Sequence, residues 1–327
     1  MTDKTRCPGS SDISALRRIW TSAFGVGDDE DFFSFYFKPE LCVTADHEGV
    51  PAAAGYLVPF GNLICGGESV PCAMIYAVAV LPGQRNRGLG THIVNDLVRL
   101  AQSAGYPAVV LCPSEDSLFD YYKARSALRD WFFVSERHFR VIERTDTTPL
   151  LSRVSPYEYS CLRERLLQQI PHIAINTDAL KYQEKLCAPY GGGLYSISAP
   201  GISACAIVEK QPDGSVSVKE LLTRDVSEQA AVASIAAEFP AQDYIVRTPA
   251  LIGRQAAKLL DCTDEADATA QRTAEYCTEP EFAEMQPDRS VRRFGMLTVT
   301  SAAPGHTQIP LSSEPSTYAP WYGPAFD

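Results

Sequence analysis

The sequence lacks any long hydrophobic run and any excess of positive charge. No window approaches the roughly 18 apolar residues of a membrane-spanning helix, and the first residues lack the apolar core of about 7 to 15 residues found in secretory signals. We therefore expect a cytoplasmic protein that binds no membrane. The formal net charge of −11 argues against nucleic-acid binding, because neutralising phosphates requires clustered lysine and arginine.

Metal-site and disulfide patterns are also absent. The ten cysteines are scattered and never form a C-x-x-C pair, and the five histidines show no H-E-x-x-H pattern. We expect buried, free thiols and no metal. A chain of 327 residues exceeds the usual size of one domain, so its length predicts two domains, each with its own core.

Periodicity predicts helices and strands in alternation through the first half. Residues 12–24 have apolar side chains at helical spacing behind Asp12, a residue type that favours the N-cap, and 32–37 is a second short helix or its packing face. The remaining predicted elements of this half are a hairpin, a buried strand, a helix, a strand, a helix and closing strands, at 41–46 with 52–60, 74–80, 88–104, 108–112, 114–128 and 131–143.

The second half repeats this order of elements. A linker is predicted at 145–156, and it is followed by a helix, three strands, a helix and a strand at 156–169, 194–199, 203–210, 215–225, 227–239 and 243–248. Where the repeat would hold a phosphate loop, the sequence is Thr-Arg-Asp-Val at 223–226, without glycine. Asp225 would repel an anion and can cap the next helix, so the second half is predicted to have lost ligand binding there.

A phosphate site is predicted where strand 74–80 leads into helix 88–104. The connection holds Arg85, Arg87, Gly88 and Gly90. The first amides of a helix are unpaired and carry about half a positive charge, glycines let an anion approach the backbone, and arginines add full charge. A P-loop would need a lysine after its glycines, and a dinucleotide fingerprint would need a third glycine and a later acid. Neither is present, which leaves R-x-x-G-x-G.

The run AVAVLPGQRNRGLGTHIVNDLVRLA resembles the acetyl-CoA-binding motif of the GCN5-related N-acetyltransferases (GNAT), and AVVLCPSEDSLFDYYKARSAL is similar to the next strand and helix of that family. The resemblance implies an α/β fold of the α+β kind with a mixed sheet. It implies transfer of an acetyl group from acetyl-CoA to a primary amine by direct attack in a ternary complex. The sequence departs from the family at Ser126-Ala127 and at Glu115 or Asp116, near the thioester end.

The same resemblance implies which residues bind the carrier. Loop amides would hold the pyrophosphate of coenzyme A, and a strand splayed from its neighbour would pair with the pantetheine arm. The loop residues are Arg85, Asn86, Arg87, Gly88, Leu89, Gly90 and Thr91, and the strand residues are Val78, Ala79 and Val80.

Two catalytic groups follow from resemblance. Tyr122 matches the family's tyrosine, which acts as general acid toward the departing thiolate, although it could instead be a core aromatic. A catalytic half followed by a second half resembles the enhanced-intracellular-survival acetyltransferases, whose chain end reaches the active site, so the carboxylate of Asp327 is a candidate. Cys112 could accept the acetyl group first, but no histidine near it in sequence would activate it, which favours a packed thiol.

The acceptor is constrained only by charge. Asp28, Asp29 and Asp31 could attract its ammonium group, or they could form a solvated turn. A small-molecule amine or a lysine side chain fits either interpretation. The alternative to an enzyme is a protein that binds acetyl-CoA as a sensor or scaffold.

The predicted domains are a catalytic GNAT domain at 1–148, a degenerate GNAT-like domain at 155–300 and a tail at 301–327. The aromatic end of the tail suggests docking, in the active-site region. The second domain would close the acceptor site or form a homo-oligomer contact.

Overall fold

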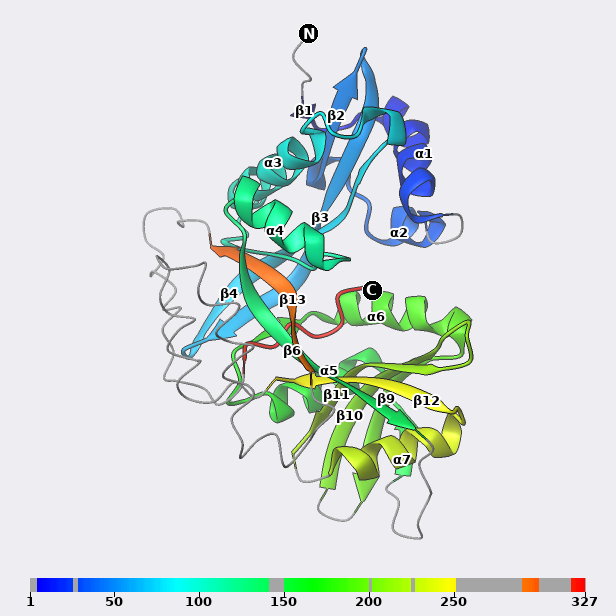
Figure 1. Ribbon diagram of the computed structural model, residues 1–327. Coiled ribbons are helices and arrows are strands. Elements are labelled where there is room, and N and C mark those ends of the chain that lie inside the picture. Colours follow the sequence, from blue (N-terminus) through cyan, green and yellow to red (C-terminus); the bar gives the residue numbers. More distant parts are fainter. Residues whose placement is uncertain are drawn as a thin grey trace. The chain divides into compact units, whose positions relative to one another are not determined.

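A computed structural model describes residues 5–25, 29–140, 150–199, 202–224, 227–250, 290–299 and 319–326 (Figure 1). The chain divides into two compact units, and neither is continuous in sequence. The first unit comprises Met1–Asn62, Val70–Asp130 and Gly295–Ile309, and the second comprises Leu63–Ser69, Trp131–Phe294 and Pro310–Asp327. No helix in the described ranges is long and apolar enough to cross a membrane.

The first unit is a mixed sheet with helices on both faces (Figure 1). Its helices are α1 (Ile13–Phe24), α2 (Asp29–Phe35), α3 (Leu89–Ser103) and α4 (Asp116–Arg125), with 3-10 turns at Ser10–Asp12, Pro39–Leu41 and Pro82–Gln84. Its strands are β1 (Thr5–Arg6), β2 (Cys42–His47), β3 (Val50–Cys65), β4 (Glu68–Val80), β5 (Ala108–Leu111) and the later part of β13 (Ser290–Val299). They lie in the order β1-β2-β3-β4-β5-β13, and the β4–β5 pair is parallel.

Residues Gly55 and Tyr56 of β3 show how the two faces of this sheet differ. Because successive strand residues point to opposite faces, Gly55 faces α3, where an added Cβ would lie 2.6 Å from Ile93 Cγ2. Tyr56 faces the other layer, with its ring 5.9 Å from that of Trp20 in α1 and 4.8 Å from that of Phe32 in α2. The glycine lets α3 approach the sheet closely, and the aromatic side chain fills the space under α1 and α2.

Helix α3 forms because its apolar residues recur at helical spacing and all meet the sheet. The buried residues of this helix are Leu89, Ile93, Val94, Leu97 and Ala101, and they share one core with residues of β2 to β5. Each fully buried leucine or isoleucine side chain contributes about 2 kcal/mol to folding. This packing fixes the helix, and with it the position of its first turn at the end of β4.

The second unit has the same plan. Its helices are α5 (Pro156–Leu166), α6 (Thr177–Cys187) and α7 (Glu228–Glu238), with a 3-10 turn at Ala188–Tyr190. Its strands are β6 (Arg129–Arg140), β7 (Leu150–Arg153), β8 (His172–Ile175), β9 (Gly193–Ala199), β10 (Ile202–Lys210), β11 (Val216–Thr223) and β12 (Asp243–Pro249). The sheet runs β6-β12-β11-β10-β9-β7, with β11 and β12 parallel. Side chains of α7 share a core with residues of β9 to β12, while α5 and α6 pack on β9 and β10.

The two units therefore share an order of elements. In each, two helices precede three antiparallel strands, which lead through a helix to a strand parallel to the third: β2-β3-β4-α3-β5 in one and β9-β10-β11-α7-β12 in the other. Each last strand has an antiparallel neighbour from a distant part of the chain. Residues Met296–Val299 of β13 pair with β5, and β6 pairs with β12.

Most predicted elements are present, and the differences from prediction have local causes. Asp12 precedes α1 but does not cap it, because its carboxylate accepts hydrogen bonds from Arg6 Nη1 at 2.6 Å and from the Gly9 amide at 2.7 Å. The predicted closing strands at 131–143 form one described strand, β6, which ends at Arg140. The helix expected at 227–239 is capped by Ser227, which accepts from the Ala230 amide, whereas Asp225 lies outside the described residues.

Candidate active site

The junction of β4 and α3 has the geometry of an anion site. Helix α3 begins at Leu89, and Gly88 occupies the N-cap in the left-handed region, with φ 81° and no side-chain cap. An added Cβ on Gly88 would meet nothing within 4 Å. Asn86 is also left-handed, with φ 65°. Gly88 therefore offers no side chain to cap the first amides of α3, and unpaired amides at a helix N-terminus attract anions.

The two arginines of the loop lie at its surface. Arg85 is exposed, and its Nε donates to the backbone oxygen of Val80 over 3.4 Å. Arg87 is exposed as well, with Nη1 3.5 Å from Nδ1 of His47, at the end of β2. Neither guanidinium has a carboxylate partner among the described contacts. Both can add positive charge beside the end of α3.

Strand β4 parts from β5 where the pantetheine arm was expected. The parallel pairing runs from Cys72–Ala108 to Ile75–Leu111, and β5 ends there, while β4 continues to Val80. Just beyond the last pair, Ala77 has φ 48°, a conformation that costs a non-glycine residue about 1 kcal/mol. Such a kink re-aims the peptide groups that follow it, those of Val78, Ala79 and Val80.

Tyr122 projects from α4 into the core of the first unit. Its side chain is 8% exposed and packs with Phe119. Its ring lies 5.3 Å from that of Tyr121 in an edge-to-face arrangement. Burial, and to a lesser degree the neighbouring Tyr121, raises the pKa of Tyr122 to about 12. The phenol is therefore protonated at neutral pH and can act only as a proton donor there.

Tyr121 is a residue of this site that the sequence motif did not single out. Its hydroxyl lies 2.7 Å from Oγ1 of Thr91, in the first turn of α3. An added Cβ on Gly90 would lie 3.7 Å from the same hydroxyl. The Arg125 guanidinium covers the ring at 4.6 Å from its centroid. The adjacent tyrosines at 121 and 122 were visible in the sequence, but only the structure separates one that faces α3 from one that enters the core.

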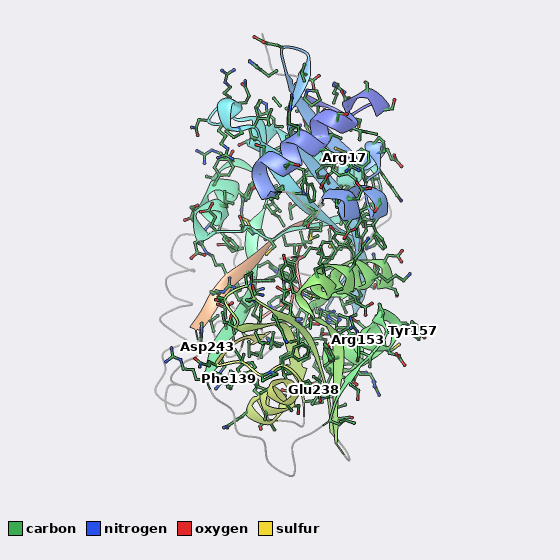
Figure 2. The ribbon with its side chains drawn as sticks, turned by 90° about the vertical axis from the view of Figure 1, so that its right-hand side faces the viewer. Arg17, Phe139, Arg153, Tyr157, Glu238 and Asp243 are labelled. Atoms are coloured by element: carbon green, nitrogen blue, oxygen red, sulfur yellow. The ribbon has the colours of Figure 1, made fainter. Side chains whose placement is uncertain are left out.

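Acidic residues at the start of α2 form ion pairs within the first unit. Asp29, Glu30 and Asp31 form the first turn of the helix, where negative charge is favourable, and Asp28 lies outside the described residues. Arg17 Nη1 lies 2.9 Å from Asp29 and 2.8 Å from Glu30. This arginine, labelled in Figure 2, also covers the ring of Phe33 at 5.0 Å. Asp29 is therefore already ion-paired within the first unit.

The other predicted candidates are placed as follows. Asp327 lies outside the described residues, and residues 319–326 before it are buried in contact with the second unit. Cys112 follows β5, is partly buried and is a free thiol, like every cysteine in the described ranges. In the same ranges no three side chains of histidine, cysteine, aspartate or glutamate gather in a metal-binding group.

Comparison with known proteins gives a family match in the first part of the chain. Residues 4–125 match the family model of the acetyltransferase (GNAT) domain. No curated protein sequence matches the chain significantly.

Solved structures of similar fold include a GCN5-related N-acetyltransferase from Anabaena variabilis, with 16% identity, a TM-score of 0.59, and coverage of 91% of this chain and 73% of that one. A probable N-acyltransferase from Enterococcus faecalis has 14% identity, a TM-score of 0.61, and coverage of 91% and 72%. Eis1 from Mycobacterium abscessus has 14% identity, a TM-score of 0.55, and coverage of 91% and 73%. At this identity the likeness concerns the fold. The match over residues 4–125 identifies this part of the chain as a GNAT acetyltransferase domain.

Proposed function

We propose that the first unit transfers an acetyl group from acetyl-CoA to a primary amine by direct attack in a ternary complex. The observation that carries this proposal is the end of β4. Strand β4 continues past the end of β5 and leads to α3, whose N-cap is a glycine without a capping side chain. The residues present fit a thioester carrier with a diphosphate, because Gly88 leaves the backbone open and Arg85 and Arg87 add positive charge.

In this proposal the amides of residues 85–91 bind the pyrophosphate, and peptide groups of Val78, Ala79 and Val80 pair with the pantetheine arm. The neutral amine attacks the acetyl carbonyl carbon, the C–N bond forms, and the C–S bond breaks. Tyr122 gives its proton to the departing thiolate, and the amine gives up a proton to a base or to water. The products are the N-acetyl amine and coenzyme A.

The proposal keeps the Asp327 carboxylate as a second catalytic group and Asp28 and Asp31 as residues that attract the acceptor. The Arg17 ion pair argues for a structural role of Asp29 instead. The acceptor class is a small-molecule amine or a lysine side chain, and the proposed setting is the cytoplasm. The domains proposed from the sequence are 1–148, 155–300 and the tail 301–327.

The test is an acceptor screen that measures free thiol from acetyl-CoA in the presence of a panel of amines. We expect thiol release with at least one amine and a mass increase of one acetyl group on that amine. Tight calorimetric binding of acetyl-CoA without thiol release from any amine would favour the sensor alternative. Absence of binding would refute the site itself. Removal of Asp327 alone, with turnover unchanged, would exclude the terminal carboxylate from the mechanism.

A further inference from the structure

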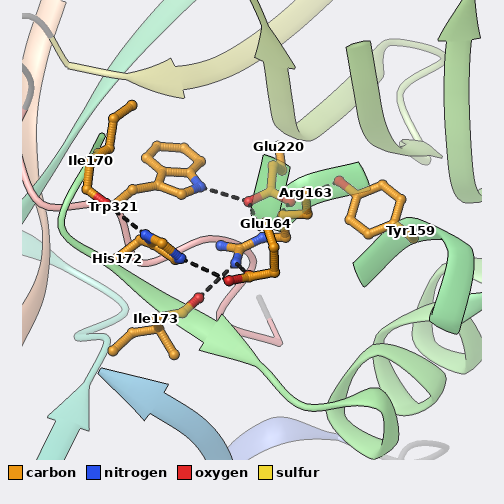
Figure 3. Close-up of polar contacts among 8 residues, drawn as sticks. All are labelled: Tyr159, Arg163, Glu164, Ile170, His172, Ile173, Glu220 and Trp321. Carbon is orange, nitrogen blue, oxygen red and sulfur yellow. Dashed lines mark hydrogen bonds and ion pairs between the residues drawn. The ribbon is translucent and has the colours of Figure 1, made fainter. Parts of the chain in front are cut away.

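The C-terminal segment Ala319–Phe326 is anchored to a buried ion pair in the second unit (Figure 3). Glu220 of β11 is fully buried and accepts hydrogen bonds from three groups: the Tyr159 hydroxyl at 2.7 Å, Arg163 Nε at 3.1 Å and the Trp321 indole N–H at 2.6 Å. Arg163, equally buried, donates from Nη1 to the backbone oxygen of Ile173 at 2.6 Å. The indole of Trp321 is thus one of the groups that satisfy a buried carboxylate.

The backbone of the segment is held as well. The Trp321 amide donates to the Pro171 oxygen at 2.7 Å, and the Ile173 amide donates to the Trp321 oxygen at 3.0 Å, so Trp321 bridges to β8 as a strand residue would. Gly323 has φ 90°, and an added Cβ would lie 2.7 Å from Arg163 Nη2. Only glycine fits there. The Phe326 ring lies 4.9 Å from that of Tyr182, so the end of the segment also packs on α6.

The segment meets β11 and β12 where these two strands part. Their parallel pairing covers Val216–Tyr244 to Val218–Val246 and then ends, although β11 continues to Thr223 and β12 to Pro249. Beyond the pairing, the segment contacts both: the Ala319 amide donates to the Ala250 oxygen at 2.8 Å, and Trp321 bonds to Glu220. A register shift opposite Ile207 and Val208 marks Lys219 as a bulge immediately before Glu220.

The first unit also has an irregularity just beyond the end of its parallel pair. There the parallel pairing of β4 and β5 ends at Ile75–Leu111, and the left-handed Ala77 follows. The order of elements makes β4 and β11 equivalent, and likewise β5 and β12. Two residues beyond the last parallel pair lies Ala77 in the first unit and the buried Glu220 in the second. Arg163 and the indole of Trp321 already bind this carboxylate, so the point is occupied, and Ser227 caps α7, the equivalent of α3.

We propose that Ala319–Phe326 is a built-in ligand of the second unit. The segment occupies the parting of β11 and β12, which corresponds by the internal repeat to the parting of β4 and β5. This inference rests on the proposed function, because the proposed function assigns the place where β4 and β5 part to the pantetheine arm. The chain accordingly binds one thioester carrier rather than two. Its own C-terminal segment occupies the place in the second unit where a second carrier would bind.

Hydrogen exchange followed by mass spectrometry tests the docking in the full chain. Trp321→Phe removes the indole N–H and keeps an aromatic ring. We expect the amides within 171–175 and 319–326 to exchange about 10- to 100-fold faster than in the wild type, because one hydrogen bond to a charged group is lost. The matched control is Tyr157→Phe, in the same unit, whose side chain is 68% exposed and points outward (Figure 2). It should leave these rates unchanged.

Calorimetry with coenzyme A tests the correspondence between the units. We expect one carrier per chain, and two per chain would overturn the inference. Unchanged exchange in Trp321→Phe would overturn it too, and Gly323→Ala gives a second variant that must accelerate exchange at 319–326. No binding of coenzyme A would instead contradict the proposed function, and the exchange rates would still decide whether the segment is docked.

Discussion

The Tyr121 hydroxyl lies 2.7 Å from Oγ1 of Thr91, and this contact ties α4 to the first turn of α3. Thr91 belongs to the loop proposed to hold the pyrophosphate, while Tyr121 is adjacent to the proposed general acid. The contact therefore links the two ends of the candidate site through one pair of hydroxyl groups. It also holds Tyr121 beside Gly90, where an added Cβ would lie 3.7 Å from the tyrosine hydroxyl.

Replacing Tyr121 with phenylalanine should weaken binding of coenzyme A and leave turnover intact. Loss of one partly buried hydrogen bond costs about 0.5–1.5 kcal/mol, which corresponds to roughly a 2- to 10-fold higher Kd. Titration calorimetry measures the Kd, and saturating kinetics should give a kcat within about 2-fold of wild type. An unchanged Kd would mean that the contact does not order the loop.

Replacing Tyr122 with phenylalanine should lower kcat and leave the Kd for coenzyme A nearly unchanged. The ring still fills the same space beside Phe119, so the melting temperature should stay close to that of the wild type. Without the proton donor, kcat should fall about 100-fold, while the Kd for coenzyme A changes little. Undiminished turnover at saturating substrate would exclude Tyr122 as the general acid.

The raised pKa of Tyr122 predicts a pH dependence of stability. In the unfolded chain a tyrosine titrates near its ordinary value of 10, whereas burial raises the folded pKa to about 12. The folded state therefore holds this proton more tightly, and the stabilisation is fully present below pH 10 and is lost as the pH rises toward 12.

Unfolding in urea at pH 9 and pH 11 measures this effect. The wild type should lose about 1 kcal/mol more than Tyr122→Phe over that interval. Other tyrosines titrate in both proteins and cancel in the comparison. A difference of the opposite sign would mean that Tyr122 is more readily ionised in the folded state.

Gly88→Ala should impair carrier binding through the backbone. Its φ of 81° disfavours any residue with a Cβ by about 1 kcal/mol, and relaxation of that strain would turn the first amides of α3 away from the ligand. We expect the Kd for coenzyme A to rise at least about 5-fold. Gly83→Ala is the control, because an added Cβ there meets nothing within 4 Å and no left-handed φ is required. Equal effects of the two substitutions would contradict the role assigned to Gly88.

Gly55→Ala should destabilise the first unit. The added Cβ would lie 2.6 Å from Ile93 Cγ2 and 2.9 Å from Leu97 Cδ1, so α3 must shift or side chains must leave their rotamers. Such overpacking costs about 1–3 kcal/mol, and chemical unfolding would measure it. Stability equal to the wild type would show that α3 is not held at this distance.

The sequence was most informative where structure depends on neighbours along the chain. The hairpin of β2 and β3, the fully buried β5, the start of α3 at Leu89 and the left-handed glycine before it all follow from local spacing and residue type. The glycines at 88 and 90 and the start of α3 are also neighbours in the sequence. The carrier site itself stays a prediction, made from a few consecutive residues.

The remaining differences from prediction depend on partners that residue type alone does not reveal, whether near in the chain or far from it. Asp12 is a residue type that favours the N-cap, but its carboxylate accepts hydrogen bonds from Arg6 and the Gly9 amide instead. β13 was not predicted, because its pairing with β5 joins residues far apart in the chain. The aromatic segment 319–326 packs within the second unit, on partners such as Glu220 and Pro171 that have no signature in the sequence, and its docking in the active-site region stays a prediction.

The pairing of Met296–Val299 with β5 has a consequence for how the protein is made. The N-terminal unit cannot acquire its full complement of strands when its first 130 or so residues emerge from the ribosome, because its final strand is translated after nearly all of the second unit. Folding in this chain is therefore expected to be completed late, with an incomplete sheet edge awaiting residues near 299. A nascent chain released before that point would carry an exposed edge at β5, the strand beside the candidate site.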